Sequence, residues 1–274
     1  MPELPEVETI VRGLAPVLRG RRVAAVWGSG FPLHLNRAVD LKALRAVTVG
    51  QSIRGIRRRG KYMLIQVAEA GAGVVVHLGM TGRLRVQPAG AARAPHTHVV
   101  FTLDRDDELR FADARRFGWV AAGTPLADLP ALAALGPDPL SDLDAPTLRA
   151  LLADSRAPIK SFLLDQRRVA GLGNIYVAEA LFRAGIHPAT PARRVARRAP
   201  ALLEAIRAAL EGGIARRGTT LRDYVDAEGQ RGDNARALLV YGREGEPCSR
   251  CGAVIRRRVD GGRATFFCAK CQAR

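Results

Sequence analysis

Apolar residues recur at helical spacing directly after the amino terminus of this chain. Val7, Ile10, Val11, Leu14 and Leu18 would lie together on one face of an α-helix. A proline and two glutamates occupy the predicted first turn, and a glycine follows the last apolar position, as helix ends prefer. The pattern therefore predicts a packed leading helix that holds the residues just before it in place.

Between about residues 21 and 126, short apolar and β-branched stretches alternate with glycine, proline and aspartate. This punctuation is typical of strands joined by turns. The predicted strands lie at 52–67, 74–78, 84–86, 97–103, 109–111 and 117–121. Short strands at this spacing favour a sandwich or a barrel, and we predict an N-terminal β-sandwich domain over residues 1–127.

The pattern changes again after residue 127. Residues 128–144 are rich in proline, glycine and aspartate, so we predict a linker there. Helical spacing then returns, and a small cysteine-bearing module begins at residue 241. The predicted helices lie at 148–153, 159–166, 175–184 and 202–214. The predicted fold is an α+β multidomain chain, with a helical domain at 145–240 and a finger at 241–274.

Composition narrows the class of partner. The 274 residues carry a formal net charge of +17, which indicates a polyanionic partner. This length is enough for two domains with buried cores, and a hydrophobic content of 47% suits a soluble globular protein. No apolar run approaches the ~20 residues that span a bilayer, and the acidic start is unlike a secretory signal. We expect a cytoplasmic monomer whose cysteines are reduced or bound to metal.

The extreme amino end is a candidate nucleophile. The chain begins Met1-Pro2-Glu3, and an initiator methionine is normally removed before a residue as small as proline. An α-amino group has a pKa near ~7.8, so a neutral fraction is present at physiological pH. A secondary amine that attacks a sugar carbon gives a cationic iminium, which is a strong electron sink. The alternative is an ordinary capped helix with a frayed end.

A basic run joins two of the predicted strands. It contains Arg57, Arg58 and Arg59, followed by Gly60 and Lys61. Basic runs most often form a solvated face, and that interpretation stays open for the three arginines. Only four of the 43 basic residues are lysines. A coding bias towards arginine explains most positions, but each lysine is a candidate for chemistry that a guanidinium cannot perform.

The four cysteines form two closely spaced pairs at the carboxyl end. Cys248 and Cys251 are separated from Cys268 and Cys271 by sixteen residues. This spacing predicts a zinc ribbon with four thiolates around one tetrahedral Zn²⁺, and disulfides are the weaker alternative in a cytosolic protein. Four cysteines leave no open coordination position, so the zinc would be structural. Arg263 follows two glycines at the predicted tip of a hairpin between the pairs.

Several motifs occur in the order of one known family. They are MPELPEVE, RRGKY, HLGMTG, DARRFG, GLGNIYVAEALFRAGIHP and the two cysteine pairs. Together they resemble formamidopyrimidine-DNA glycosylase, the bacterial enzyme that excises oxidised purines and nicks the strand. Leu4 favours this family over the related endonuclease VIII branch, which begins MPEGPE. The resemblance implies a helix-two-turn-helix in the helical domain and a bifunctional glycosylase and abasic-site lyase acting on double-stranded DNA near the nucleoid.

The resemblance also implies roles for individual residues. Pro2 would attack the anomeric carbon, Glu3 would protonate the opening sugar, and Lys61 and Arg263 would assist β- and δ-elimination. The DNA contacts would come from Met80, His96, Arg115, Phe117, Arg156, Lys160 and Asn174. Met80, Arg115 and Phe117 would fill the space that a flipped base leaves, and Lys160 and Asn174 would clamp phosphate. Alternation along a strand would place Arg115 and Phe117 on one face.

Some alternatives stay open at this point. Met80 could instead fill a core gap. His96 and His98 could form a metal pair, although no third ligand is apparent. Within the same class, an endonuclease VIII-like enzyme for oxidised pyrimidines is possible, and outside it a catalytically inactive zinc-ribbon DNA-binding protein. Residues 232–238 lack the aromatic residue and glutamine that the family has there, which predicts a more mobile lesion loop and a weakened preference among oxidised bases.

Overall fold

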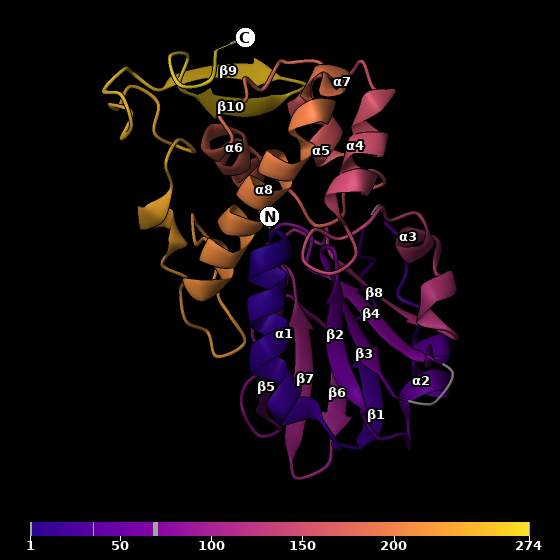
Figure 1. Cartoon of the computed structure of the whole chain (residues 1–274). Helices are drawn as coiled ribbons and strands as arrows, with labels where there is room; N and C mark the ends of the chain where they lie inside the picture. Colours follow the sequence, from indigo (N-terminus) through magenta and orange to yellow (C-terminus); the bar gives the residue numbers. More distant parts are fainter. Residues whose placement is uncertain (1, 35, 68–70, 274) are drawn as a thin grey trace. The chain divides into compact units, whose positions relative to one another are not determined.

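The computed structural model describes residues 2–34, 36–67 and 71–273 (Figure 1). Its contacts divide the chain into two compact units. The first unit contains Met1–Ala133 together with Arg217–Gly232, and the second contains Ala134–Arg216 together with Asp233–Arg274. The predicted α+β multidomain class is confirmed. Chain order alone did not indicate that residues 217–232 pack with the first unit.

The leading helix α1 runs over Leu4–Leu18, as the apolar stripe predicts. Glu3 is its N-cap, and a proline lies in the first turn. All five apolar positions of the predicted stripe are buried in α1. The helix packs against strand β2 (Gly55–Arg59), which places the amino end of the chain beside the sheet (Figure 1).

Two four-stranded antiparallel sheets form the β-sandwich of the first unit, with strand orders β1-β6-β7-β5 and β2-β3-β4-β8. The remaining strands are β1 (Val23–Gly28), β3 (Tyr62–Gln66), β4 (Gly73–His77), β5 (Arg83–Pro88), β6 (Thr97–Leu103), β7 (Asp107–Ala112) and β8 (Trp119–Gly123). Side chains from α1 and both sheets share one apolar core. The predicted sandwich is therefore confirmed, although β1 was not among the predicted strands and β8 begins two residues later than predicted.

The sequence analysis missed one helix of the first unit. Helix α2 (Leu41–Thr48) packs against β1, β4 and β8. Asp40 caps it, because its Oδ1 accepts the N–H of Ala43 at 2.9 Å. The helix is short and buries only Leu44 and Thr48, so its apolar pattern was weak. Short helical elements also begin the predicted linker, at Leu126–Asp128 and at α3 (Pro130–Ala133).

The second unit contains the four predicted helices, a short helix that was not predicted, and a two-stranded finger. The helices are α4 (Ala145–Ala153), α5 (Ile159–Leu164), α6 (Asn174–Arg183), α7 (Ala192–Val195) and α8 (Ala199–Ala215). Two turns connect α5 to α6, and the Gln166 side chain holds them. Its Nε2 donates to the carbonyls of Leu164 and Leu172, and its Oε1 accepts from the N–H of Gly171. Strands β9 (Arg256–Asp260) and β10 (Arg263–Phe267) form the finger hairpin.

Along the described parts of the chain, no helix is long and apolar enough to cross a membrane.

Candidate active site and DNA-binding residues

The amino end is held by a hydrogen-bonded helix start. Pro2 is buried directly before α1, and Glu3 is only 4% exposed. Glu3 and Glu6 form a capping box, in which the Glu3 N–H donates to Glu6 Oε2 at 2.8 Å. The N–H of the peptide bond between Pro2 and Glu3 is therefore held in place by the Glu6 carboxylate. A nucleophilic amine at Pro2 would be placed by this contact rather than by a flexible tail.

Glu6 has a second partner that the sequence analysis missed. Its Oε1 accepts the N–H of Thr219 at 2.7 Å, and its side chain is buried. The hydroxyl of Tyr224 lies 3.4 Å from the Glu6 carbonyl oxygen, and burial followed by the nearby Glu6 charge raises the pKa of this phenol. Gly218 has φ +85°, and a Cβ there would lie 3.0 Å from Glu6 Cγ. One carboxylate thus connects the amino end to residues 217–232, which we call the docked loop.

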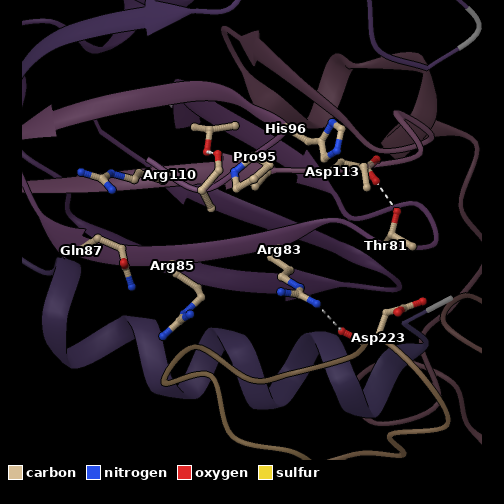
Figure 2. A pocket seen from close by; sticks show the side chains of 13 residues that line it. Thr81, Arg83, Arg85, Gln87, Pro95, His96, Arg110, Asp113 and Asp223 are labelled. Carbon is tan, nitrogen blue, oxygen red and sulfur yellow. Dashed lines mark hydrogen bonds between the residues drawn. The ribbon is translucent and has the colours of Figure 1, made fainter. Parts of the chain in front are cut away.

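Two arginines of β5 hold the docked loop from the other side. Arg83 Nη2 donates to the Asp223 carbonyl at 3.3 Å (Figure 2). Arg85 donates to the carbonyls of Ala227 and Glu228 at 3.3 and 3.1 Å. None of these partners lies in the 232–238 segment that departs from the family pattern. The predicted loop mobility stays a prediction, but the groups that hold the loop are now identified.

Lys61 lies in the turn between β2 and β3 and is 6% exposed. Arg58 holds this turn to α1, because its Nε donates to Glu8 Oε2 at 2.9 Å and its Nη1 to the Gly60 carbonyl at 3.1 Å. The Arg58 side chain is 7% exposed, so the interpretation of the basic run as a solvated face is wrong at this position. The turn that carries Lys61 is therefore joined to α1 through the ion pair between Arg58 and Glu8.

His77 is a further candidate functional residue, and it lies beside Lys61. It lies opposite Tyr62 on one side and Trp119 on the other in the sheet register, and it contacts both rings. Burial, followed by the positive charge of Lys61, lowers the pKa of His77 to about 4. The neutral ring accepts the N–H of Gly79 at His77 Nδ1, at 3.1 Å. The sequence signal was only a histidine at the end of a strand.

Met80, Arg115 and Phe117 come together at one end of the sandwich. Gly79 has φ +59°, and a Cβ there would lie 2.4 Å from the Gly118 nitrogen, so the two loops pack backbone to backbone. The Arg115 guanidinium carbon lies 4.7 Å from the Phe117 ring centre. Met80 is 40% and Phe117 46% exposed, so the interpretation of Met80 as a core residue is wrong.

The loop that carries Arg115 and Phe117 is a turn rather than a strand. Asp113 organises it, since its carboxylate accepts from Gly118 N at 2.7 Å, from Arg115 N at 3.2 Å and from Thr81 Oγ1 at 2.5 Å. Figure 2 shows the Thr81–Asp113 contact. The two side chains share a side because of this turn, and not because of strand alternation as predicted.

The predicted alternative of a histidine metal pair is wrong. His98 is buried, its Nε2 lies 3.1 Å from the Asp113 carbonyl oxygen, and its Nδ1 lies 3.1 Å from Ser29 Oγ. Both ring nitrogens are therefore occupied by the fold. His96 is exposed and has φ +62°, which turns it out of the strand register. His96 stays a candidate phosphate contact.

In the second unit, Lys160 and Asn174 meet at one carbonyl of the finger. Lys160 Nζ donates to the Ala264 carbonyl at 2.8 Å and to Thr265 Oγ1 at 2.6 Å, and Asn174 Nδ2 donates to the same carbonyl at 2.9 Å. Lys160 is 3% exposed, and burial lowers its pKa to about 8. Asn174 is the first residue of α6, and Gly173 is the N-cap.

These contacts place the finger hairpin. Arg263 is exposed at its tip, directly before Ala264, as predicted. Glu179 of α6 holds the approach to the finger, because its carboxylate accepts the N–H groups of Leu239, Val240 and Tyr241 at 2.9–3.0 Å. Arg156 is exposed between α4 and α5. The predicted catalytic residues are thus divided, with Arg263 in the second unit and the others in the first.

The four cysteines fit a structural zinc ion. Their sulfur atoms all lie within 4.8 Å of one another, as four ligands of one tetrahedral ion would. Backbone N–H groups of Arg250 and Cys271 point at Cys248 Sγ and Cys268 Sγ at 3.4 and 3.5 Å, which supports thiolate charge. The predicted zinc site is confirmed by this cluster and by the zinc-finger family match below.

Comparisons with known families cover almost the whole chain. Residues 1–120 match the formamidopyrimidine-DNA glycosylase N-terminal domain, and residues 135–225 match the H2TH domain of the same enzyme. Residues 245–274 match the zinc finger found in FPG and IleRS.

Individual relatives agree with these matches. The formamidopyrimidine-DNA glycosylase of Rhizorhabdus wittichii is 49% identical over 99% of this chain and 100% of its own length. The MutM (FPG) structure of Thermus thermophilus is 40% identical, with a TM-score of 0.86 over 99% of this chain and 98% of that one. A Lactococcus lactis FPG mutant bound to Fapy-dG DNA is 35% identical, with a TM-score of 0.89 over the full length of both chains. This chain therefore belongs to the formamidopyrimidine-DNA glycosylase family.

Proposed function

We propose that this chain removes oxidised purines, namely formamidopyrimidines and 8-oxoguanine, from duplex DNA and then cleaves the strand at the abasic site. Family membership supports the enzyme class, a bifunctional glycosylase and abasic-site lyase. The observation that carries the mechanism is the amino end, where Pro2 precedes a capping box fixed by a buried carboxylate. Lactococcus lactis FPG has been crystallised with DNA containing an abasic site, which supports the same substrate here.

The chemistry starts from the Pro2 amine. Its lone pair forms a bond to the sugar C1′ as the glycosidic bond breaks, and the proton of the amine passes to the departing base. Glu3 gives a proton to the ring oxygen, the sugar opens, and an iminium forms between Pro2 and C1′. The iminium acidifies C2′–H, and loss of that proton expels the 3′-phosphate. Loss of a second proton, from C4′, expels the 5′-phosphate.

Charged side chains of both units serve these steps. Arg58 holds the β2–β3 turn that carries Lys61, and we propose that the Lys61 ammonium contacts the phosphate beside the lesion. Arg263 would contact phosphate from the finger tip, together with His96, Arg156 and Asn174. Lys160 would act from behind the hairpin, since its amine already binds Ala264 and Thr265. The zinc would cross-link the finger and take no part in the reaction.

Base flipping leaves a gap in the stack. Met80 and Phe117 are exposed on two loops that pack against each other, and the Arg115 guanidinium lies over the Phe117 ring. We propose that the two apolar side chains wedge into the gap and that Arg115 bonds the orphaned base. The relatives are bacterial proteins, so this activity would operate on the chromosome in the bacterial cytoplasm.

The test is covalent trapping. Incubation with an 8-oxoguanine duplex and borohydride should reduce the iminium and cross-link the DNA to Pro2. Pro2→Gly should retain some cross-linking because an amine remains, whereas Glu3→Gln should lose base excision more than cleavage of preformed abasic sites. A cross-link that maps to Lys61 or Lys160 would refute the assignment, and no cross-link at all would favour an inactive DNA-binding protein.

One observation supports a second candidate substrate. A Lactococcus lactis FPG complex, 34% identical to this chain, contains DNA with an oxidised pyrimidine. Oxidised pyrimidines could therefore enter the same site here. A panel of duplexes with purine and pyrimidine lesions, compared by single-turnover rates, separates the two substrate classes.

A further inference from the structure

A groove on the first unit includes His96, a proposed phosphate contact, but its other lining residues have no role in the reaction described above. Its lining includes Trp27, Ser29, Phe31, His96, His98 and Arg116, and its volume is about 590 Å³. We call it the Phe31 groove. It lies where β1 ends and β6 begins, and the turn before β8 closes one side. Its volume is within the range of small-ligand sites.

Two aromatic side chains are exposed at this groove. Phe31 is 62% and Trp27 40% exposed, although large apolar side chains are usually covered. The turn that carries Phe31 is held in place. The Phe31 N–H donates to Ser29 Oγ at 3.2 Å, and the Ser29 N–H donates to the His98 carbonyl at 3.0 Å. Phe31 is therefore presented to solvent by a fixed turn.

An arginine lies beside each ring, and the one beside Trp27, Arg93, is paired with Glu108 at 3.0 Å. The Arg116 guanidinium carbon lies 6.0 Å from the Phe31 ring centre, and that of Arg93 lies 4.5 Å from the Trp27 ring centre. His96 is exposed at the same groove. The lining residues that the structure describes include no carboxylate. Aromatic faces beside arginines are the combination that binds unstacked nucleotides, since bases stack on the rings and phosphates bind the cations.

The position of Arg116 indicates which nucleotide of the DNA would occupy the groove. Arg116 lies between Arg115 and Phe117, which the proposed function places at the orphaned base. The Phe31 groove therefore adjoins the residues that would contact the orphaned base, and it would receive the next nucleotides of the strand opposite the lesion. This step rests on the proposed function.

We propose that the Phe31 groove binds the strand opposite the lesion, one or two nucleotides beyond the orphaned base. The phosphate contacts Arg116 and His96, and the base stacks on Phe31. Trp27 lies at the far end, where Arg93 covers one face of its ring. The groove would hold the complementary strand while the damaged strand reacts, so it should contribute to affinity and not to the chemical step.

The first test pairs protein and DNA changes. Binding is measured for a duplex with a tetrahydrofuran abasic analogue, and for a second duplex in which the opposite strand ends at the orphaned base. Phe31→Ser should weaken binding to the full duplex by about tenfold, the effect of losing one stacked base. It should have little effect on the truncated duplex, because the stacked nucleotide is already absent. Phe31→Tyr should bind both duplexes like the wild type.

Val17→Ser is the matched control, since Val17 is an exposed apolar residue of α1 at 43% exposure. It should leave both affinities unchanged. If Phe31→Ser binds the full duplex like the wild type, or loses the same factor on both duplexes, the proposed site is wrong.

The second test uses Trp27 as a reporter. The chain has two tryptophans, so a Trp119→Phe background leaves Trp27 as the sole indole. Binding of the full duplex should reduce acrylamide quenching of its fluorescence, and the truncated duplex should not. Equal protection by both duplexes would overturn the inference. Borohydride trapping distinguishes this failure from failure of the proposed function, because Phe31→Ser at saturating enzyme should still cross-link through Pro2.

Discussion

The Glu6 carboxylate offers the sharpest test of how the amino end is positioned. It accepts the Glu3 N–H at 2.8 Å on one oxygen and the Thr219 N–H at 2.7 Å on the other. Glu6→Gln keeps the shape of the side chain but replaces one acceptor oxygen with an NH₂ group. That group would face a backbone N–H, so two donors would oppose each other in a buried site. Either the helix start or the docked loop must then lose its partner.

The magnitude follows from these contacts. A hydrogen bond to a charged group contributes about 1.5–3 kcal/mol, and a buried donor left without a partner costs about 1–3 kcal/mol. The remaining bond also weakens, because a neutral amide oxygen replaces a carboxylate. We therefore expect the free energy of unfolding of the first unit to fall by ~2–4 kcal/mol. If ~2 kcal/mol of this loss destabilises the docked position of the loop, excision of 8-oxoguanine should slow by up to ~30-fold.

Two assays check the reasoning. Calorimetry should show a lower transition temperature for Glu6→Gln. Single-turnover kinetics should show a larger loss on an 8-oxoguanine duplex than on a preformed abasic site, because we propose that the docked loop is the lesion loop and contacts the flipped base. Glu228→Gln is the control, since this glutamate of the docked loop is 76% exposed and should change stability by less than ~0.5 kcal/mol. Unchanged stability together with an unchanged rate ratio for Glu6→Gln would refute the bridging role.

Three further predictions concern Arg85, the zinc site and Lys160. Arg85→Ala removes two contacts to docked-loop carbonyls and should lower the ratio of 8-oxoguanine to abasic-site rates severalfold; an unchanged ratio would show that the loop is held without it. Cys248→Ser should release zinc and abolish tight duplex binding while the first unit stays folded, as metal analysis and circular dichroism would show; fully active protein without zinc would contradict this. For Lys160, the folded-state pKa of about 8 lies below the usual 10.5, so the unfolded chain binds more protons between these values. The stability of the wild type relative to Lys160→Met in urea melts should therefore rise as pH increases from 8 to 10, and a flat or falling difference would contradict this.

The sequence by itself determined the elements that depend on local pattern. The apolar stripe of α1 and most of the sandwich strands follow from periodicity, because a buried face imposes its own spacing on the residues that fill it. The zinc site follows from the spacing of two cysteine pairs, since thiolate chemistry and a short hairpin leave few other arrangements. Exposure of Arg263 at the hairpin tip follows from the two glycines before it.

Only the tertiary structure decided what polar residues do within these elements. Glu6 looked like half of a capping box, but it also binds Thr219, more than two hundred residues away. Arg58 looked like solvated surface but is buried in a pair with Glu8, and His98 is occupied by Asp113 and Ser29. Phe31 carried no sequence signal, because exposure depends on which neighbours fail to cover a side chain. Local periodicity encodes which face is buried, whereas a polar partner distant in sequence is selected only when the folded chain brings both groups out of water together.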